Sequence, residues 1–339
     1  MFNSAKIRKI FGKTNSKSAK CHKIDYYFPY FQIIFFFFAK NVVILHPNSA
    51  LRFLDNTVMR VFQRNADLQN ALFQERKQGR TIGLVPTMGA LHEGHASLVR
   101  CSVKENDITV VSVFVNPTQF NDKADLDRYP RTMDADCKLL EECKVDYIFA
   151  PTVDEMYPTP DTRHFEYPPV STVMEGAHRP GHFNGVCQVV SRLLYIVRPQ
   201  KAYFGEKDFQ QIAVVKAMVR ALGIKVDIVE CPIVRGEDGL AKSSRNTLLT
   251  PKERAIAPAI YSALRNAVDY SMSHGVSETH DKVVADVNAV DGLEVEYFSI
   301  VNGDSLLDVD SWEGGNVVGC ITVYCGATPI RLIDHIRFR

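Results

Sequence analysis

The chain has 339 residues, of which 46% are hydrophobic and 23% charged, so a disordered, collagen-like or coiled-coil protein is excluded. Its 40 basic and 39 acidic residues leave a net charge of +1, which disfavours a protein that binds the phosphate backbone of nucleic acids. At roughly 100–200 residues per domain, this length predicts two domains.

Residues 1–58 differ in charge from the rest of the chain. They hold nine basic and two acidic residues, a net charge of +7, which leaves the remainder near −6. An aromatic run over residues 26–38 follows the basic stretch, as in a signal peptide or membrane anchor, but it is shorter than the roughly 20 residues of a spanning helix. We interpret residues 1–58 as an extension, or as upstream sequence read in frame before Met59, in which the aromatic run is disordered, membrane-associated or removed. Targeting, membrane association and an integral structural role are the alternatives.

From Met59 onward, short apolar runs alternate with amphipathic segments. This alternation predicts an α/β fold over residues 59–240: a Rossmann-like, doubly wound parallel sheet with helices on both faces. The first helix is expected from residue 66. The expected strands are 81–86, 108–115, 145–150, 201–204 and 225–230, and the expected helices between them are 93–104, 133–143, 185–197 and 209–222.

The pattern changes after about residue 240, where a smaller α+β C-terminal domain, residues 241–339, is expected. A capping box at Thr250, with Pro251 at the first helical position, predicts a helix of about six turns with a kink at Pro258. The remaining elements are a helix over 278–290 and strands over 294–301 and 317–324.

The first chemical motif, PTMGALHEGH over residues 86–95, lies at the turn from the first strand to the following helix. This turn belongs to the carboxyl edge of the sheet, where ligands bind, and the helix N-terminus offers N–H groups to an anion. His92 and His95 share one face of the first helical turn and suit a polyphosphate, to whose leaving group they can donate hydrogen bonds. A zinc site, for which no third ligand is evident, and two unrelated capping histidines are the alternatives.

The second motif is a loop with two hydroxyls and two cations, Lys242-Ser243-Ser244-Arg245. Such a loop can fold over a triphosphate, with the guanidinium binding phosphate oxygens as a fork. Alone it predicts only an exposed polar loop. Paired with an HxGH turn, it is typical of nucleotidyl transferases that attack an α-phosphate and expel pyrophosphate.

Two further motifs follow strands of the predicted sheet. In FGEKDFQQ, Lys207 can reach a phosphate, Asp208 can accept hydrogen bonds from ribose hydroxyls, and Gln211 lies one turn into the helix. In VNPTQF, Gln119 offers a neutral donor and acceptor to a polar substrate. Each glutamine alone would be predicted as a side chain on a surface helix or loop. Because both lie at carboxyl ends of parallel strands, a shared site is favoured.

In this order, PTMGALHEGH, FVNPTQF, RPGHFNGV, FGEKDFQQ and SSRN resemble the motifs of the pantothenate synthetase (pantoate–β-alanine ligase) family. The resemblance runs from about Met59 to the C-terminus, including EYFSIVN and RLID, and residues 1–58 have no counterpart in it. Lys242 stands where the family usually has an apolar residue, often Met, so its role is open.

The resemblance implies an AMP-forming ligase of pantothenate and coenzyme A biosynthesis, which joins pantoate to β-alanine at the expense of ATP. The pantoate carboxylate would attack the α-phosphate, giving pantoyl adenylate and pyrophosphate, and the β-alanine amine would then displace AMP. Residues 59–240 would bind the nucleotide and pantoate, while residues 241–339 would close as a lid that shields the adenylate from water.

The resemblance also implies four catalytic residues: His92, His95, Lys207 and Arg245. His95 would be the proton donor associated with pyrophosphate departure. Lys207 and Arg245, helped by the two serines of the loop, would offset charge on the transferring phosphoryl group.

For the substrates, Asp208 would hold the ribose, Val234 the adenine, and Gln119 and Gln211 pantoate, with Gln119 also near β-alanine. Mg²⁺ would bridge phosphate oxygens, and its protein ligands cannot be read from the sequence. The residues expected to bind ATP are Met88, Gly89, Ala90, Leu91, His92, Glu93, Gly94, His95, Gly205, Glu206, Lys207, Asp208, Val234, Lys242, Ser243, Ser244 and Arg245.

The remaining expectations concern environment and partners. The eight cysteines contain no CxxC pair, which indicates reduced thiols in the cytoplasm and gives no support to a zinc ribbon or thioredoxin chemistry. The resemblance implies a homodimer, and we expect no nucleic-acid partner and no stable membrane insertion of the catalytic part. A nucleotidyl transferase that makes a dinucleotide and a non-catalytic nucleotide-binding protein are the competing functions.

Overall fold

The computed structural model describes residues 22–28, 31–38, 41–45 and 59–339. The chain divides into two compact units, residues 1–58 and 59–339. All the motifs singled out in the sequence fall in the second unit.

The first unit contains an antiparallel sheet in the order β1-β2-β3. Its strands are β1 (His22–Phe28), β2 (Phe31–Phe38) and β3 (Asn41–Leu45). The aromatic run, which we expected to lack a fold of its own, contributes to β1 and β2, and aromatic and β-branched residues do favour strands. The interpretation of residues 1–58 as an extension stays a prediction, and part of that segment lies outside the described residues.

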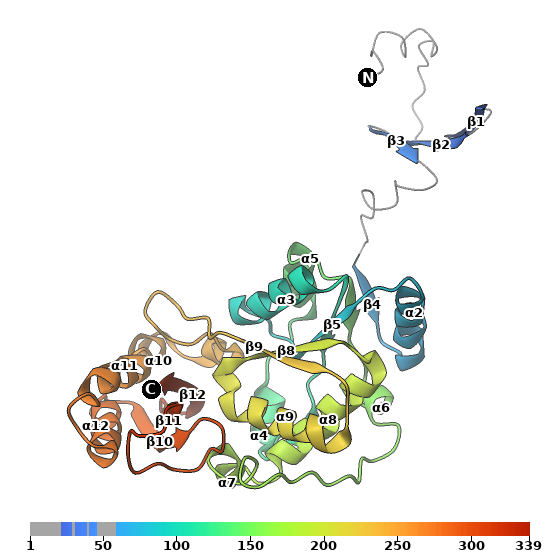
Figure 1. Cartoon of the computed structure of the whole chain (residues 1–339). Coiled ribbons are helices and arrows are strands. Elements are labelled where there is room, and N and C mark those ends of the chain that lie inside the picture. The colour runs from blue at the N-terminus through green and yellow to red at the C-terminus, as the bar shows by residue number, and fades with distance from the viewer. Residues whose placement is uncertain (1–21, 29–30, 39–40, 46–58) are drawn as a thin grey trace. The chain divides into compact units, whose positions relative to one another are not determined.

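The second unit is built on a six-stranded parallel sheet in the order β4-β7-β6-β5-β8-β9 (Figure 1). Its strands are β4 (Arg60–Phe62), β5 (Ile82–Thr87), β6 (Ile108–Val113), β7 (Tyr147–Phe149), β8 (Lys201–Gly205) and β9 (Asp227–Cys231). All but β4 were predicted to within a few residues. Strand β4 is too short to show a period of two, and it pairs with β7 at the edge of the sheet.

Helices cover both faces of this sheet. On one face lie α2 (Asn65–Lys77), α8 (His182–Val197) and α9 (Phe209–Leu222), and on the other α3 (Glu93–Glu105) and α5 (Met133–Glu142). Along β5, Ile82 and Leu84 join one apolar core and Val85 the other, as the alternation of side chains in a strand requires. The predicted doubly wound sheet is confirmed.

Short helices that the sequence did not predict connect these elements. They are the 3₁₀ turns η1 (Pro117–Gln119), η2 (Glu206–Asp208) and η3 (Ser244–Leu248) and the helices α4 (Lys123–Arg128), α6 (Val153–Met156) and α7 (Glu175–His178). Segments this short do not complete the apolar spacing that identifies a helix. They matter because η1, η2 and η3 carry Gln119, Lys207 and Arg245.

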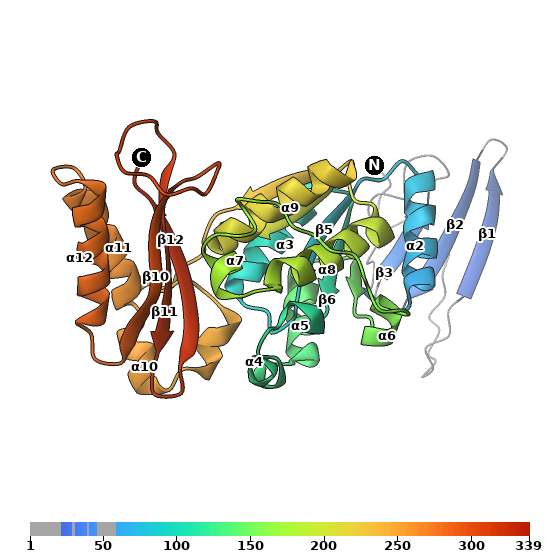
Figure 2. The same ribbon diagram turned by 90° about the horizontal axis from the view of Figure 1, so that it is seen from below.

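The C-terminal part has a three-stranded antiparallel sheet in the order β10-β11-β12, with an apolar core of its own (Figure 2). Its elements are α10 (Pro251–Ile256), α11 (Ala259–Tyr270), α12 (Val276–Asn288), β10 (Leu293–Asn302), β11 (Val317–Cys325) and β12 (Ile330–Arg337). Helices α11 and α12 lie on one face of this sheet. The predicted α+β character is confirmed, although β12 was not predicted as a strand.

The helix predicted to run through Pro258 is two helices instead. Its capping box is present, since the Thr250 hydroxyl accepts from the Glu253 amide and the Glu253 carboxylate accepts from the Thr250 amide. Helix α10 ends at Ile256, and α11 begins directly after Pro258, whose ring nitrogen has no hydrogen to donate to the preceding turn. Among the described helices, none combines the length and apolarity that crossing a bilayer requires.

A chain that begins at Met59 is expected to fold on its own, because residues 59–339 form a compact unit with their own apolar cores. Thermal unfolding followed by circular dichroism should be cooperative, with a midpoint within about 2 °C of that of the full chain. Insolubility of the shorter chain would show instead that residues 1–58 are structural. A full chain that sediments with membranes, beside a soluble shorter chain, would favour the anchor.

Candidate active site

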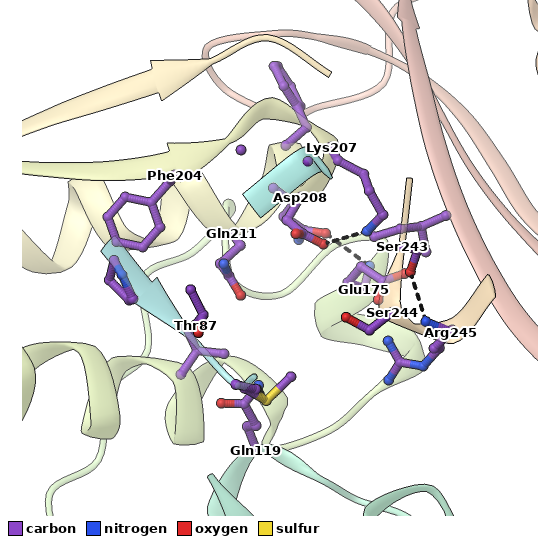
Figure 3. Close-up of a pocket in the computed structure, with 18 of the residues that line it drawn as sticks. Thr87, Gln119, Glu175, Phe204, Lys207, Asp208, Gln211, Ser243, Ser244 and Arg245 are labelled. Atoms are coloured by element: carbon purple, nitrogen blue, oxygen red, sulfur yellow. Dashed lines mark hydrogen bonds and ion pairs between the residues drawn. The ribbon is translucent and has the colours of Figure 1, made fainter. Parts of the chain in front are cut away.

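A cavity of about 260 Å³ opens at the carboxyl edge of the parallel sheet (Figure 3). In the described sheet, pairing between the neighbouring strands β5 and β8 stops at Leu84 and Ala202. The residues that end these strands, among them Thr87 and Gly205, line the cavity. Strands β11 and β12 of the C-terminal sheet supply another part of its wall. The cavity therefore lies where doubly wound sheets bind ligands.

Most of the predicted site residues meet in this cavity. Those that line it are Met88, His92, Gly94, His95, Gln119, Gly205, Lys207, Asp208, Gln211, Val234, Lys242, Ser243, Ser244 and Arg245.

Five residues expected to bind ATP do not line the cavity: Gly89, Ala90, Leu91, Glu93 and Glu206. The exposed Glu93 pairs with Arg100 on its own helix, and Glu206 lies 3.8 Å from Arg337. The amides of Ala90 and Leu91 donate to a carboxylate behind the loop.

The two histidines cap helix α3 reciprocally. His92 Nδ1 accepts from the Gly94 amide at 3.1 Å, and His95 Nδ1 accepts from the His92 amide at 3.3 Å. A β-carbon on Gly94 would lie 2.8 Å from the His92 ring, so this arrangement needs glycine between the histidines. The geometry is therefore compatible with both hypotheses, that the histidines cap the helix and that they bind a ligand. An Nδ1 that accepts leaves the proton on Nε2, which in each ring has no protein partner among the described residues.

Burial, with the neighbouring charge of Lys207, lowers the pKa of His92 to about 4. Burial, with the adjacent His92 ring, lowers the pKa of His95 to about 3. Both imidazoles of the free protein are therefore neutral near pH 7, and each offers an Nε2–H donor rather than a positive charge. A zinc site has no further support here, because the described residues contain no group of three or more His, Cys, Asp or Glu that could hold a metal.

Five cationic side chains line the cavity: Lys207, Lys242 and Arg245, together with Arg179 and Arg331. Lys207 Nζ lies 3.2 Å from Asp208 Oδ1. Burial disfavours the Asp208 carboxylate, but the charges of Lys207 and Arg245 outweigh this effect and hold its pKa below the usual range. Lys242 lies near His92 and Glu93, and it forms no ion pair among the described residues.

The serine loop closes against the histidine turn. Ser243 caps η3 by accepting from the Arg245 amide, while Ser244 Oγ donates to the Ala90 carbonyl at 2.9 Å. Arg245 Nη2 pairs with Asp125 Oδ2 of α4 at 2.9 Å. Ser243, Ser244 and Arg245 thus lie together on one side of the cavity, apart from Gln119 (Figure 3).

The two glutamines differ in how firmly they are held. Gln119 is 9% exposed, and its Oε1 accepts from Asn116 while its Nε2 faces the Met88 sulfur at 3.3 Å. Gln211 lines the cavity and has no side-chain hydrogen bond within the described residues, so its amide is free for a ligand.

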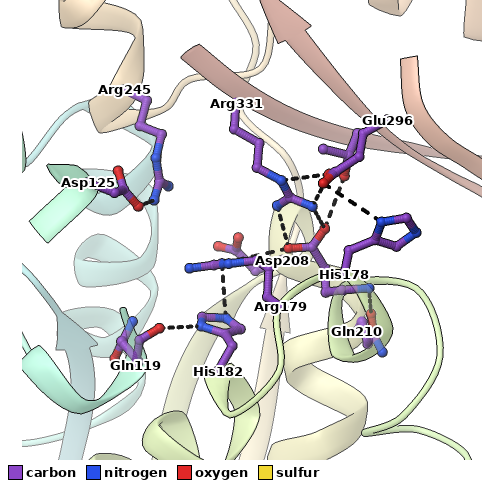
Figure 4. A network of polar contacts seen from close by, with 12 residues as sticks. Gln119, Asp125, His178, Arg179, His182, Asp208, Gln210, Arg245, Glu296 and Arg331 are labelled. Carbon is purple, nitrogen blue, oxygen red and sulfur yellow. Dashed lines mark hydrogen bonds and ion pairs between the residues drawn. The ribbon is translucent and has the colours of Figure 1, made fainter. Parts of the chain in front are cut away.

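A buried ionic network that the sequence did not predict forms part of the cavity wall (Figure 4). Both Glu175 oxygens accept from Arg331 of β12 at 2.6 Å, and Tyr297 donates to the same carboxylate at 2.7 Å. Burial disfavours the Glu175 carboxylate, but Arg331 holds its pKa well below the usual value. Because Glu175 and Arg331 are 156 residues apart, no local spacing could have paired them.

Arg179 and His182 lie beside this network and were also missed as site residues. Arg179 is 3.7 Å from Glu175, and its Nη1 donates to His182 Nε2 at 3.3 Å. His182 Nδ1 donates to the Gln119 carbonyl at 2.8 Å, while burial and the Arg179 charge lower the pKa of His182 to about 4. The RPGHFNGV motif contains both residues and was the available signal.

Comparison with known proteins gives one consistent result. The family model described as "Pantoate-beta-alanine ligase" matches residues 60–337. Pantothenate synthetase of Bacteroides fragilis is 58% identical over 282 residues, 83% of this chain and 99% of that protein, and the Porphyromonas gingivalis one is 55% identical over 281.

Solved structures agree. Pantothenate synthetase from Thermus thermophilus has a TM-score of 0.77 at 43% identity and covers 83% of this chain and 99% of its own. Pantoate–β-alanine ligase from Francisella tularensis, complexed with β,γ-ATP and β-alanine, has a TM-score of 0.70 at 34% identity and covers 83% and 98%.

In the free protein, the side-chain ¹⁵N resonances of His92 and His95 should report the Nε2–H tautomer and should not titrate between about pH 5 and pH 8. The reason is that both pKa values lie below this window, whereas an ordinary histidine titrates near about 6.5. His92→Ala and His95→Ala identify the signals. A midpoint near pH 6.5 for either residue would contradict the neutral pair.

Proposed function

Because the chain belongs to the pantoate–β-alanine ligase family and condenses pantoate with β-alanine using ATP, we propose that both steps occur in the cavity between β5 and β8. Membership of this family decides against the dinucleotide-forming transferase and the non-catalytic protein. The observation that carries the proposal is the convergence of the histidine pair, Lys207 with Asp208, the serine loop and both glutamines on one cavity.

ATP occupies the charged side of the cavity. Lys207 and Arg245 offset charge on the phosphates, and Ser243 donates to phosphate oxygens. Asp208, at the start of α9, accepts from the ribose, and Val234 packs against the adenine. Lys242 adds a cation beside His92 that is available to the triphosphate.

The histidine pair stabilises the leaving group as a set of neutral donors. Negative charge develops on the oxygen between the α- and β-phosphorus atoms as pyrophosphate departs, and Nε2–H groups fixed in advance need no reorganisation to bind it. This refines the expectation for His95. Because the pKa of His95 is low, its ring is neutral in the free protein and holds no imidazolium proton to transfer. We therefore propose that His95 first stabilises the departing pyrophosphate by donating a hydrogen bond.

Pantoate lies near Gln119 and Gln211, with its carboxylate directed at the α-phosphorus. The free amide of Gln211 and the held amide of Gln119 match hydroxyl and carboxylate groups of such a substrate. Arg179, whose ion pair with Glu175 is long at 3.7 Å and whose Nη1 also donates to His182, supplies a cation for the β-alanine carboxylate. The amine then attacks the acyl carbon and AMP leaves.

Two features of the reaction depend on groups beyond these side chains. Mg²⁺ would enter with ATP and offset the negative charge of its phosphates. The described residues contain no group of three or more His, Cys, Asp or Glu that could hold the metal without the nucleotide. Apolar side chains of the C-terminal sheet, Ile321 and Ile333, line the cavity and limit the access of water to the adenylate.

The lid role of residues 241–339, the homodimer and the cytoplasmic location stay predictions.

Replacing His95 or Lys207 by alanine is expected to slow adenylation by about 10²–10³-fold with the fold retained, because each removes one fixed electrostatic contact to the phosphates. Pyrophosphate release from ATP and pantoate measures the step. The exposed His164→Ala and Lys252→Ala, whose side chains are 76% and 81% exposed, are matched controls. Release at the control rate would remove that residue from the mechanism.

Replacing Gln211 by alanine is expected to raise the pantoate KM far more than the ATP KM, since a buried polar partner contributes about 1–3 kcal/mol. Initial rates with each substrate varied in turn give the two constants. Gln74→Ala, an exposed glutamine on α2, is the control. A weakened ATP KM with unchanged pantoate KM would assign Gln211 to the nucleotide.

A further inference from the structure

We infer that Asp136 is a positioning residue of the active site, which holds the loop before α3 so that His92 and His95 face the cavity. Asp136 does not line the cavity and belongs to none of the motifs singled out in the sequence. The inference rests on the proposed role of the two histidines in adenylation.

The Asp136 carboxylate is buried behind the loop, and both of its oxygens accept hydrogen bonds. It lies on α5 with 2% of the residue exposed. Its Oδ2 accepts from the Ala90 amide at 3.0 Å, and its Oδ1 accepts from the Leu91 amide at 2.7 Å and from the Thr132 hydroxyl at 3.1 Å. A carboxylate can accept at both oxygens, which an amide side chain of the same shape cannot do.

The loop it holds has an unfavourable backbone conformation. Gly89 has a φ of +80° and Ala90 a φ of +49°, and the second is disfavoured for a residue with a β-carbon. A β-carbon on Gly89 would lie 3.0 Å from both Asp136 Oδ2 and Val113 Cγ1, so the loop is also closely packed. Such a conformation persists only where surrounding contacts fix it, and Asp136 supplies two of them.

The fixed peptides lead directly into the histidine pair. The Leu91 amide donates a hydrogen bond to Asp136. Leu91 directly precedes His92, whose own amide donates to His95 Nδ1. The Ala90 carbonyl accepts from Ser244 on the cavity side. The same short loop is therefore held from behind by Asp136 and from the front by the serine loop.

Asp136 also determines which donors a phosphate meets. The Ala90 and Leu91 amides, which a glycine-containing turn before a helix could offer to an anion, are consumed by this carboxylate. The Gly94 and His92 amides are consumed by the two imidazoles. The Nε2–H groups of the two imidazoles stay available to the ligand, and they hold their direction only while the loop is fixed.

Asp136→Asn keeps the side-chain volume but replaces one acceptor by an NH₂ group that opposes an amide donor. We expect adenylation at saturating ATP and pantoate to slow by about 10–100-fold, as for a misplaced catalytic group, with the ATP KM changed by less than about threefold. Asp134→Asn, an exposed aspartate on the same helix, is the matched control. Side-chain ¹⁵N spectra should show a mixture of tautomers for His92 and His95 in Asp136→Asn only.

A double-mutant cycle separates positioning from general stability. If Asp136 acts through the histidines, Asp136→Asn should cost clearly less in a His95→Ala background than in the parent protein. A full, multiplicative loss in that background would contradict the inference.

An adenylation rate for Asp136→Asn within about twofold of that for Asp134→Asn, with unchanged tautomers, would overturn the inference. If Asp136→Asn does not fold, Thr132→Ala, which removes one donor to the carboxylate, should slow adenylation by about threefold, and an unchanged rate would overturn it equally. Failure of the proposed function looks different. In that case His95→Ala itself would adenylate at the control rate.

Discussion

The early end of pairing between β5 and β8 is the constraint from which the site follows. These neighbouring strands are followed by helices on opposite faces of the sheet, α3 after β5 and α9 after β8. Their connections therefore diverge and leave a cavity at the carboxyl edge. Each strand delivers one group of the residues proposed to bind ATP to that cavity: the histidine turn from β5, and Lys207 with Asp208 from β8.

The electrostatics of the cavity divide between neutral donors and cations. Both imidazoles cap the first turn of α3, and burial keeps them uncharged. They therefore offer hydrogen-bond donors in fixed directions without adding to the positive charge. Lys207, Lys242 and Arg245 are cations of the same cavity, and Lys207 and Arg245 already have carboxylate partners, Asp208 and Asp125. ATP bound as proposed would compete with these carboxylates for the cations.

The C-terminal sheet belongs to the site as well. Arg331 reaches from β12 to Glu175 on α7 with two hydrogen bonds, and Tyr297 of β10 adds a third. Removing one partner of such a buried pair leaves an uncompensated charge, which typically costs about 3–5 kcal/mol. The pair therefore ties the wall formed by β11 and β12 to the half of the molecule that contains the parallel sheet.

Local sequence patterns predicted much of the fold and some of the residues that line the cavity. The apolar run of β6 and the start of α3 at an HxGH turn could be read directly, because burial on both faces and helix capping leave short-range signatures. Strand β12 was not predicted, because Asp334 and His335 interrupt its apolar alternation, although both are buried in the structure, where β12 pairs with β11. Asp136 was missed because its partners, Ala90 and Leu91, lie about 45 residues away and the contacts are to backbone amides.

The central claim is that ATP and pantoate share one cavity, so that the pantoate carboxylate attacks the α-phosphorus and the oxygen it contributes leaves with AMP. Pantoate labelled with ¹⁸O in its carboxylate tests this directly. Mass spectrometry of the products should find one labelled oxygen in each AMP and none in pyrophosphate. One labelled oxygen is expected in the amide product in any case, so unlabelled AMP, with the other label appearing in phosphate or pyrophosphate, would contradict the account.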